Sequence, residues 1–95
     1  MAQVRKMQAE MAKAQEEIAA TIVVGEAGGG NVKIEMTANH IVKSIKIAKE
    51  LLDPNDVETL EDLITVALNI AHEKASAFAN GKMGALTGGL KIPGV

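Results

Sequence analysis

Few residues of this chain have side chains suited to catalysis or metal binding. It has two histidines, His40 and His72, and no cysteine, so the usual zinc sites of histidine and thiolate cannot be assembled within one chain. A carboxylate-assisted metal site is the alternative left open, but we expect no metal and no cofactor. The acidic pairs Glu16-Glu17 and Glu61-Asp62 fall on polar helix faces, whereas general acid–base catalysis needs a carboxylate in a desolvated cleft. The sequence therefore predicts a protein that is not an enzyme and has no small-molecule substrate.

The glycine-rich segment Gly25–Gly30 has some features of a phosphate-binding loop. Such a loop lies between a strand and a helix whose N-terminus faces the phosphate, and it ends in a Lys-Ser or Lys-Thr pair. Here a strand follows from Val32, and no such pair closes the motif. We therefore interpret the segment as a hairpin turn that needs the positive φ angles of glycine.

The basic side chains are stronger candidates, as contacts to the phosphates of a nucleic acid. Charge is segregated along the chain: residues 1–52 carry a net +1, residues 53–73 carry −6 and residues 74–95 carry +3. We expect the basic ends to meet DNA and the acidic block to repel and orient it. The predicted DNA contacts are Arg5, Lys6, Lys13, Lys74, Lys82 and Lys91. A second-ranked group, set lower because alternate strand positions can point inward, is Lys43, Lys46 and Lys49.

The composition limits the ways in which DNA can be bound. One phenylalanine and no tryptophan or tyrosine leave no aromatic platform on which single-stranded bases could stack. Binding through phosphates should be weakly sequence-specific and strongly salt-dependent. Two other interpretations stay open. The lysines could serve only solubility, or the chain could be an oligomeric interaction module that docks proteins through its methionine-rich first helix and its tail.

Hydrophobic periodicity predicts the elements that position these residues. Residues 2–19 are strong helix formers with a narrow apolar stripe, so we expect a first helix there. At about 1.5 Å per residue this helix is longer than a small sheet can cover, and part of it should project. Three strands follow, at residues 21–26, 32–37 and 41–47. The alternation slips between Val42 and Ile45, which predicts a bulge in the third strand.

A second helix is predicted from the segment Leu51–Asp56 to about Asn80. Asp53 should accept bonds from amides of the first turn, Pro54 should occupy the first helical position, and Gly81 should end the helix. The apolar arc of this helix is roughly 200° wide, about twice the width that covering one core requires. The spare flank therefore predicts a homodimer, with an interface at Leu63, Val66 and Ile70.

The element order predicts an α+β protein, in which a three-stranded antiparallel meander packs against the second of two long helices. We expect a single domain at residues 1–80 and a flexible glycine-rich tail at residues 81–95. No apolar stretch is long enough to span a bilayer and there is no cysteine. These two features predict a cytoplasmic protein without membrane contacts.

Four segments occur together in one collinear order that covers nearly the whole chain. They are AGGG (27–30) with Val32, VKSIKI (42–47), LLDPNDVETLEDLI (51–64) and KMGALTGGL (82–90) with IPG (92–94). In combination they closely resemble the YbaB/EbfC family of bacterial nucleoid-associated proteins. The resemblance implies an α-β-β-β-α protomer in an intertwined homodimer with projecting helices. It also implies DNA binding, a nucleoid location and, in some relatives, effects on gene expression.

Overall fold

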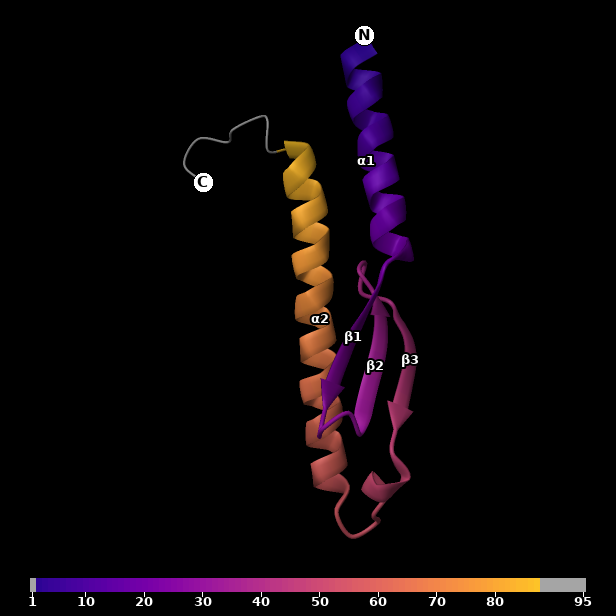
Figure 1. Ribbon diagram of the computed structural model, residues 1–95, viewed down its shortest axis with the longest axis vertical. Helices are drawn as coiled ribbons and strands as arrows, with labels where there is room; N and C mark the ends of the chain where they lie inside the picture. Colours follow the sequence, from indigo (N-terminus) through magenta and orange to yellow (C-terminus); the bar gives the residue numbers. More distant parts are fainter. Residues whose placement is uncertain (1, 88–95) are drawn as a thin grey trace, which may run out of the picture.

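The computed structural model describes the backbone of residues 2–87 and the side chains of residues 3–84. In chain order the elements are α1 (Ala2–Ala20), β1 (Ile22–Ala27), β2 (Val32–Thr37), β3 (Val42–Ile47), the 3-10 helix η1 (Lys49–Leu51) and α2 (Val57–Thr87) (Figure 1). The predicted α-β-β-β-α order and the α+β class are confirmed. Within the described residues, neither helix has a stretch that is long and apolar enough to cross a bilayer.

The strands form an antiparallel meander in the order β1-β2-β3. The turn between β1 and β2 is made by Gly28–Gly30, whose φ angles lie between +64° and +91°, a region that glycine enters without a Cβ clash. The pairing of β2 with β3 shifts register between Glu35 and Met36, and Lys43 is the extra residue on β3. Both the hairpin turn and the predicted bulge are confirmed.

The core lies between α2 and the sheet face formed by β1 and β2. Alternate residues of β2, namely Val32, Ile34 and Met36, are buried in it, as a period of two predicts. From α2 the core receives three alanines, spaced four residues apart and each 0% exposed: Ala67, Ala71 and Ala75. Because their side chains are a single methyl group, the helix axis comes close to the sheet.

Gly25 marks the closest approach of β1 to α2. A Cβ atom added there would lie 2.0 Å from the carbonyl oxygen of Ala67 and 2.6 Å from the amide nitrogen of Ala71. Gly25 is buried in β1, as the predicted strand at residues 21–26 requires, so the interpretation of the whole segment Gly25–Gly30 as a turn is wrong at this residue. The residue is needed for the contact between helix and sheet, and the turn is left to Gly28–Gly30.

The start of α2 differs from the prediction. The helix begins at Val57 and not at Pro54. Asp53 forms a turn of its own, because its carboxylate accepts the Asn55 amide at 2.9 Å and its carbonyl accepts the Asp56 amide at 3.0 Å. The prediction that Asp53 binds amides of the first helical turn is therefore wrong.

The end of α2 is also corrected. The helix continues through Gly81 to Thr87, so the predicted end near Asn80 is wrong. Glycine inside a helix costs only about 1 kcal/mol relative to alanine, which the packing of this helix on α1 offsets. Residues 81–87 of the predicted tail belong to α2, and residues 88–95 lie outside the described part of the chain.

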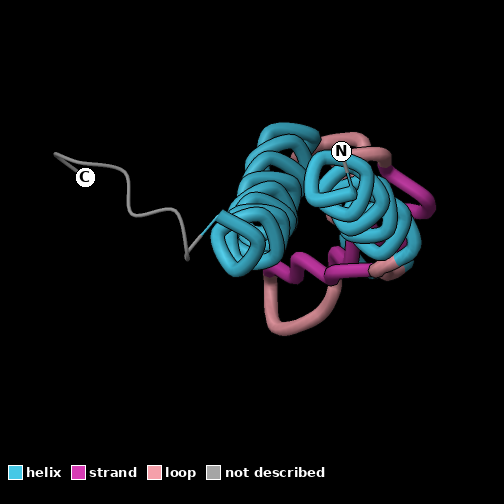
Figure 2. The backbone as a smooth tube through the Cα atoms, turned by 90° about the horizontal axis from the view of Figure 1, so that it is seen from above, coloured by secondary structure: helices cyan, strands magenta, loops and turns pink. Residues whose placement is uncertain are grey.

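α1 extends well beyond the sheet. Its buried residues are Ala14 and Ile18, whereas every side chain from Gln3 to Lys13 is exposed. Figures 1 and 2 show α1 running beside the C-terminal half of α2 and away from the strands. The molecule is accordingly long, with a radius of gyration of 18.0 Å against about 12 Å for a compact domain of this length. The predicted projection is confirmed.

Candidate nucleic-acid interface

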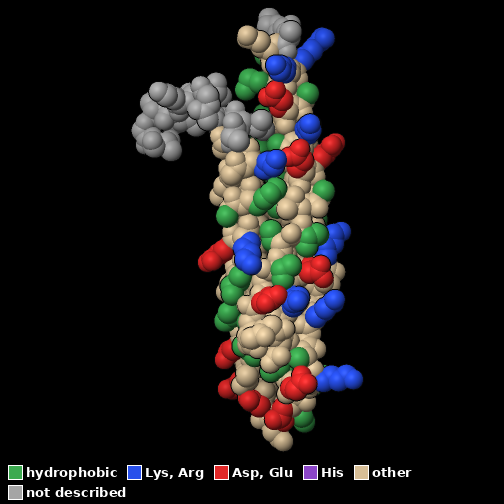
Figure 3. All heavy atoms as spheres, viewed as in Figure 1, with side chains coloured by type: hydrophobic (Ala, Val, Ile, Leu, Met, Phe, Trp, Pro, Cys, Tyr) green, Lys and Arg blue, Asp and Glu red, His purple; other side chains and the backbone are tan. Residues whose placement is uncertain are grey.

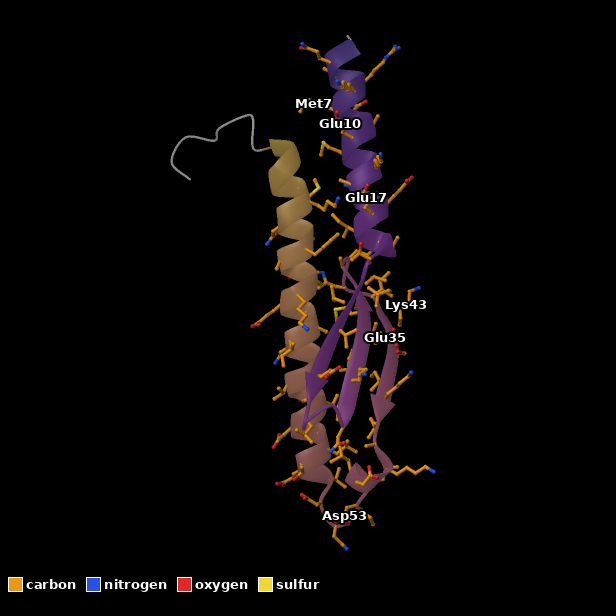
Figure 4. All side chains as sticks on the ribbon, viewed as in Figure 1. Met7, Glu10, Glu17, Glu35, Lys43 and Asp53 are labelled. Atoms are coloured by element: carbon orange, nitrogen blue, oxygen red, sulfur yellow. The ribbon has the colours of Figure 1, made fainter. Side chains whose placement is uncertain are left out.

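The projecting half of α1 carries the first group of residues predicted to meet DNA. Arg5, Lys6 and Lys13 are exposed, and within residues 3–84 none of them forms an ion pair or a hydrogen bond. Their charges are therefore free to meet an external anion. Glu10 lies on the same half of the helix (Figure 4), so this surface is mixed in charge and not uniformly basic.

Lys82 is brought to α1 by the packing of the two helices. Its Nζ lies 2.5 Å from Oε2 of Glu17 and 6.0 Å from the ring centroid of Phe78. The hydrogen bond from Lys82, and then its positive charge, lower the pKa of the Glu17 carboxyl below its ordinary value, and Lys13 adds a smaller effect. Lys82 thus shares one end of the molecule with the basic residues of α1, but its charge is already paired.

The remaining predicted DNA contacts are Lys74 and Lys91. The Nζ of Lys74 donates a hydrogen bond of 2.7 Å to the carbonyl oxygen of Val24, which ties this lysine to β1. The side chain is exposed, so the charge still faces solvent. Lys91 lies outside the described residues. Sequence position alone grouped Lys74 and Lys82 with α1, and only the packing showed that both have partners within the chain.

The lysines ranked second are more accessible than expected. Lys43, Lys46 and Lys49 are all exposed, so the expectation that some of them point inward is wrong. Lys46 lies directly opposite Lys33 in the strand pairing, and both line an open hollow of about 260 Å³. Like charges facing across strands repel, and the Glu26 carboxylate 3.5 Å from the Lys33 Nζ partly offsets this. Lys33 was not among the predicted residues, although its alternation with Ile34 places it on the outer sheet face.

The acidic block lies at the end of the molecule away from the projecting half of α1. Five of its six acids are exposed residues at the start of α2 and in the loop before it: Asp53, Asp56, Glu58, Glu61 and Asp62. Figure 3 shows acidic side chains gathered over the end where α2 begins. The long axis of the molecule, 63 Å in extent, therefore separates the acid-rich end from the free cations of α1.

The residues predicted to form a dimer interface have different surroundings. Leu63 packs against the core of its own chain, Ile70 is half-buried, and Val66 is 47% exposed. α2 packs on β1 and β2, so the apolar side chains of β3 are left largely uncovered. Val42 is 42% exposed and Ile45 is 49% exposed. An apolar surface thus extends over β3 beside α2.

Two histidines that are distant in sequence lie side by side in the structure. His40 belongs to the turn between β2 and β3, His72 lies on α2, and their ring centroids are 4.4 Å apart. The Nε2 of His40 is 3.0 Å from the Oγ of Ser76. Sequence periodicity places His40 in a turn and His72 on a polar helix face, and it carries no signal that they meet. Among the described residues, no group of three or more histidine, cysteine or acidic side chains is placed to hold a metal ion.

The fold and the charge layout define the class of the protein. An α-β-β-β-α chain with exposed cations on a projecting helix and acids gathered at the other end is a small α+β protein with a polarised charge layout. The model of the YbaB/EbfC DNA-binding family matches residues 1–90, and the chain belongs to this family. The resemblance noted in the sequence is thereby confirmed, and the chain is a DNA-binding protein and not an enzyme.

Several relatives are similar over almost their whole length. A nucleoid-associated protein of Chloroflexus aggregans is 50% identical over 91 residues, which cover 96% of this chain and 91% of the relative. One of Dictyoglomus turgidum is 50% identical over 93 residues, covering 98% and 89% of the two chains. The crystal structure of an uncharacterized protein from Helicobacter pylori superposes with a TM-score of 0.75, at 21% identity, over 95% of this chain and 91% of that one. At this identity the structural likeness supports the fold alone.

Proposed function

We propose that this chain is a homodimeric nucleoid-associated protein that binds double-stranded DNA through phosphate contacts with little sequence specificity. The family membership supports DNA as the ligand, and the names of the relatives support a nucleoid location. An effect on gene expression would follow from this DNA binding.

The observation that carries the proposal is that the three cations on the projecting half of α1 are exposed and form no hydrogen bond or ion pair within the described residues. Arg5, Lys6 and Lys13 form no hydrogen bond or ion pair with the described residues, and the side chains around them, from Gln3 to Lys13, are all exposed. Long flexible cations in this setting meet phosphates as point charges or through the guanidinium fork of Arg5. The acid-rich end of the molecule would be repelled by DNA, which leaves α1 as the end that approaches the duplex.

Low sequence specificity follows from assigning the contacts to phosphates. Base edges are read mainly by bidentate polar side chains set in the major groove, whereas contacts to phosphates carry no direct sequence information. The exposed apolar residues of this half, Val4, Met7 and Met11, read no hydrogen-bonding pattern. We therefore assign the affinity to counterion release from the phosphates.

A second copy of the chain would cover the apolar surface over β3. The predicted interface residues Leu63, Val66 and Ile70 belong to α2, and Val66 is the most exposed of the three. Pairing two copies would remove apolar area from water, and it would present two projecting α1 helices to one duplex. Two helices provide twice the number of cations, and DNA affinity rises steeply with the number of phosphates neutralised.

The proposal is tested by measuring the affinity of the untagged protein for two duplexes of unrelated sequence at several salt concentrations. We expect similar affinities for both duplexes, and a linear fall of log affinity with log salt. Replacing Arg5, Lys6 and Lys13 by alanine should weaken binding and reduce the slope by about 0.9 for every phosphate that is no longer neutralised.

A matched control replaces Lys43, Lys46 and Lys49 by alanine, which changes the net charge by the same amount at a different place. If this variant bound DNA more weakly than the α1 variant, the binding surface would be the sheet and not α1. If the parent bound neither duplex at low salt, DNA binding by this surface would be excluded. The exposed Val4, Met7 and Met11 of α1 would then be tested as a protein-docking stripe.

A further inference from the structure

The contact between the turn after β2 and the middle of α2 joins two imidazoles and a hydroxyl. The ring centroids of His40 and His72 are 4.4 Å apart, with their planes tilted by 39°. His72 and Ser76 are four residues apart on α2, so both face the same side of the helix. The Oγ of Ser76 lies 3.0 Å from the Nε2 of His40. Three side chains that bear ligand atoms thus converge from two elements.

The backbone around His40 is fixed on both sides. His40 has a φ angle of +71°, a conformation that few residues other than glycine adopt and in which histidine is enriched. Its amide donates to the Thr37 carbonyl at 2.9 Å, and the amide of Ile41 donates to the Thr37 hydroxyl at 3.0 Å. Thr37 itself is only 2% exposed. The imidazole of His40 is therefore positioned by a rigid turn, and that of His72 by a helix.

We propose that His40 and His72 form a two-imidazole binding site for a late first-row divalent metal ion, of the Cu(II) or Ni(II) type. Each ring contributes one nitrogen, and solvent completes the coordination, with the Ser76 hydroxyl at the edge of the site. Neutral imidazole is the side chain that suits zinc, copper and nickel. The ions that carboxylate and water ligands select, such as magnesium and calcium, are not expected to bind, because neither ring supplies an oxygen.

The ring separation is short enough for both imidazoles to reach one ion. With metal–nitrogen bonds of about 2.0–2.1 Å, two imidazoles on one ion have centroids about 4.5–5.2 Å apart, depending on the angle at the metal. The observed 4.4 Å lies close to this range, so small side-chain rotations would let both rings bind one ion. The affinity order should follow the general order for nitrogen ligands, with copper above nickel and copper above zinc.

The site would also connect two parts of the fold. An ion held by both rings links the turn between β2 and β3 to α2. These two segments are more than thirty residues apart in the chain. Because the unfolded chain does not hold the two rings together, the ion binds the folded state preferentially and raises the temperature of thermal unfolding. This stabilisation provides a measurement that does not depend on DNA binding.

The test is isothermal titration of the untagged protein with Cu(II), Ni(II) and Zn(II) salts, followed by thermal unfolding with and without Ni(II). The variants are His40→Asn, which retains a residue type that tolerates a positive φ angle, and His72→Gln, which keeps a good helix former. The double variant provides the baseline for binding elsewhere, including at the terminal amine. Circular dichroism of each variant without metal checks that the fold is retained.

A shared site predicts one Ni(II) ion per chain above this baseline, and a fall of at least about tenfold in affinity in either single variant, because one ligand of a chelate is removed. The rise in unfolding temperature on adding Ni(II) should be absent in both. If each single variant instead retained one of two equal and independent ions, the histidines would be separate weak ligands and the proposal would be wrong. Binding by the parent no tighter than by the double variant would also overturn it.

Discussion

At the scale of single residues, the most constrained position is a glycine inside a strand. Gly25 is the point where β1 meets the backbone of α2, with Ala67 and Ala71 directly above it. The three turn glycines have a different role, since Gly28–Gly30 supply positive φ angles in a hairpin. One residue type thus serves close packing at one position and backbone conformation a few residues later. The two roles respond differently to an added methyl group.

Substituting Gly25→Ala should destabilise the fold. The new Cβ would lie 2.0 Å from the Ala67 carbonyl oxygen, so α2 must move away from the sheet. Overpacking of this kind costs about 1–3 kcal/mol, and more when backbone must shift. Urea unfolding at a fixed protein concentration measures the change in the free energy of unfolding.

The matched control is Gly81→Ala, because nothing lies within 4 Å of a Cβ added there. This substitution should raise the free energy of unfolding by up to about 1 kcal/mol, since alanine is the better helix former. A Gly25→Ala protein as stable as the parent would show that α2 does not approach β1 as closely as described.

At the scale of elements, the position of α1 depends on its contacts with the second half of α2. An ion pair between Glu17 and Lys82 joins the two helices, and Ala14 and Ile18 are the buried residues of α1. Because Lys82 lies beyond Asn80, where the sequence predicts the helix to end, this pair exists only because α2 continues further. The C-terminal part of α2 therefore holds α1 in the orientation in which the cations of α1 project from the molecule.

The stability of the α1–α2 contact should depend on pH through Glu17. Lys82 lowers the pKa of Glu17 in the folded state, so ionised Glu17 stabilises the fold above its ordinary carboxyl pKa, and this stabilisation is lost as the pH falls through the lowered value. Thermal unfolding of the parent and of Glu17→Gln should differ at neutral pH and converge in acid. The difference should be small, because both side chains of the pair are about two-fifths exposed, at 40% and 41%.

Glu16→Gln is the control for this prediction, since Glu16 is exposed and has no partner within residues 3–84. Its unfolding temperature should follow that of the parent across the whole pH range. Equal pH profiles for Glu17→Gln and the parent would show that the ion pair does not contribute to the contact.

At the scale of the whole molecule, the protomer is long and leaves apolar surface uncovered. α2 covers two of the three strands, and Val42 and Ile45 of β3 and Val66 of α2 are exposed. A chain with one phenylalanine and no tryptophan or tyrosine has few large side chains with which to fill its own core. Association with a second copy is the way in which such a fold would bury the missing area.

Substituting Val66→Glu should weaken the proposed homodimer. Burying an unpaired carboxylate in an apolar interface costs roughly 3 kcal/mol or more, which corresponds to a decrease of at least about 100-fold in the association constant. Analytical ultracentrifugation over a range of concentrations measures this constant.

Thr65→Glu places the same charge on the neighbouring exposed position of α2, which is turned by about 100° around the helix from Val66. That variant should keep the association constant of the parent. An equal decrease in both variants would place the interface elsewhere, and no change in either would argue against a dimer formed through this flank.

The sequence by itself determined the features that depend on neighbouring residues. The alternation of Val32, Ile34 and Met36 sets a strand and its buried face, and the slip before Ile45 sets a bulge, because both follow from the period of the backbone. The separation of acidic from basic segments is also a property of the chain alone.

Only the tertiary structure decided the features that depend on residues far apart in the chain. These are the close approach of Gly25 to α2, the partners of Lys74 and Lys82, and the meeting of His40 with His72. Each is fixed by how α2 lies against β1, the turn after β2 and α1. No local periodicity carries that information, because the free energy of such packing comes from contacts between elements and not from the preferences of any one of them.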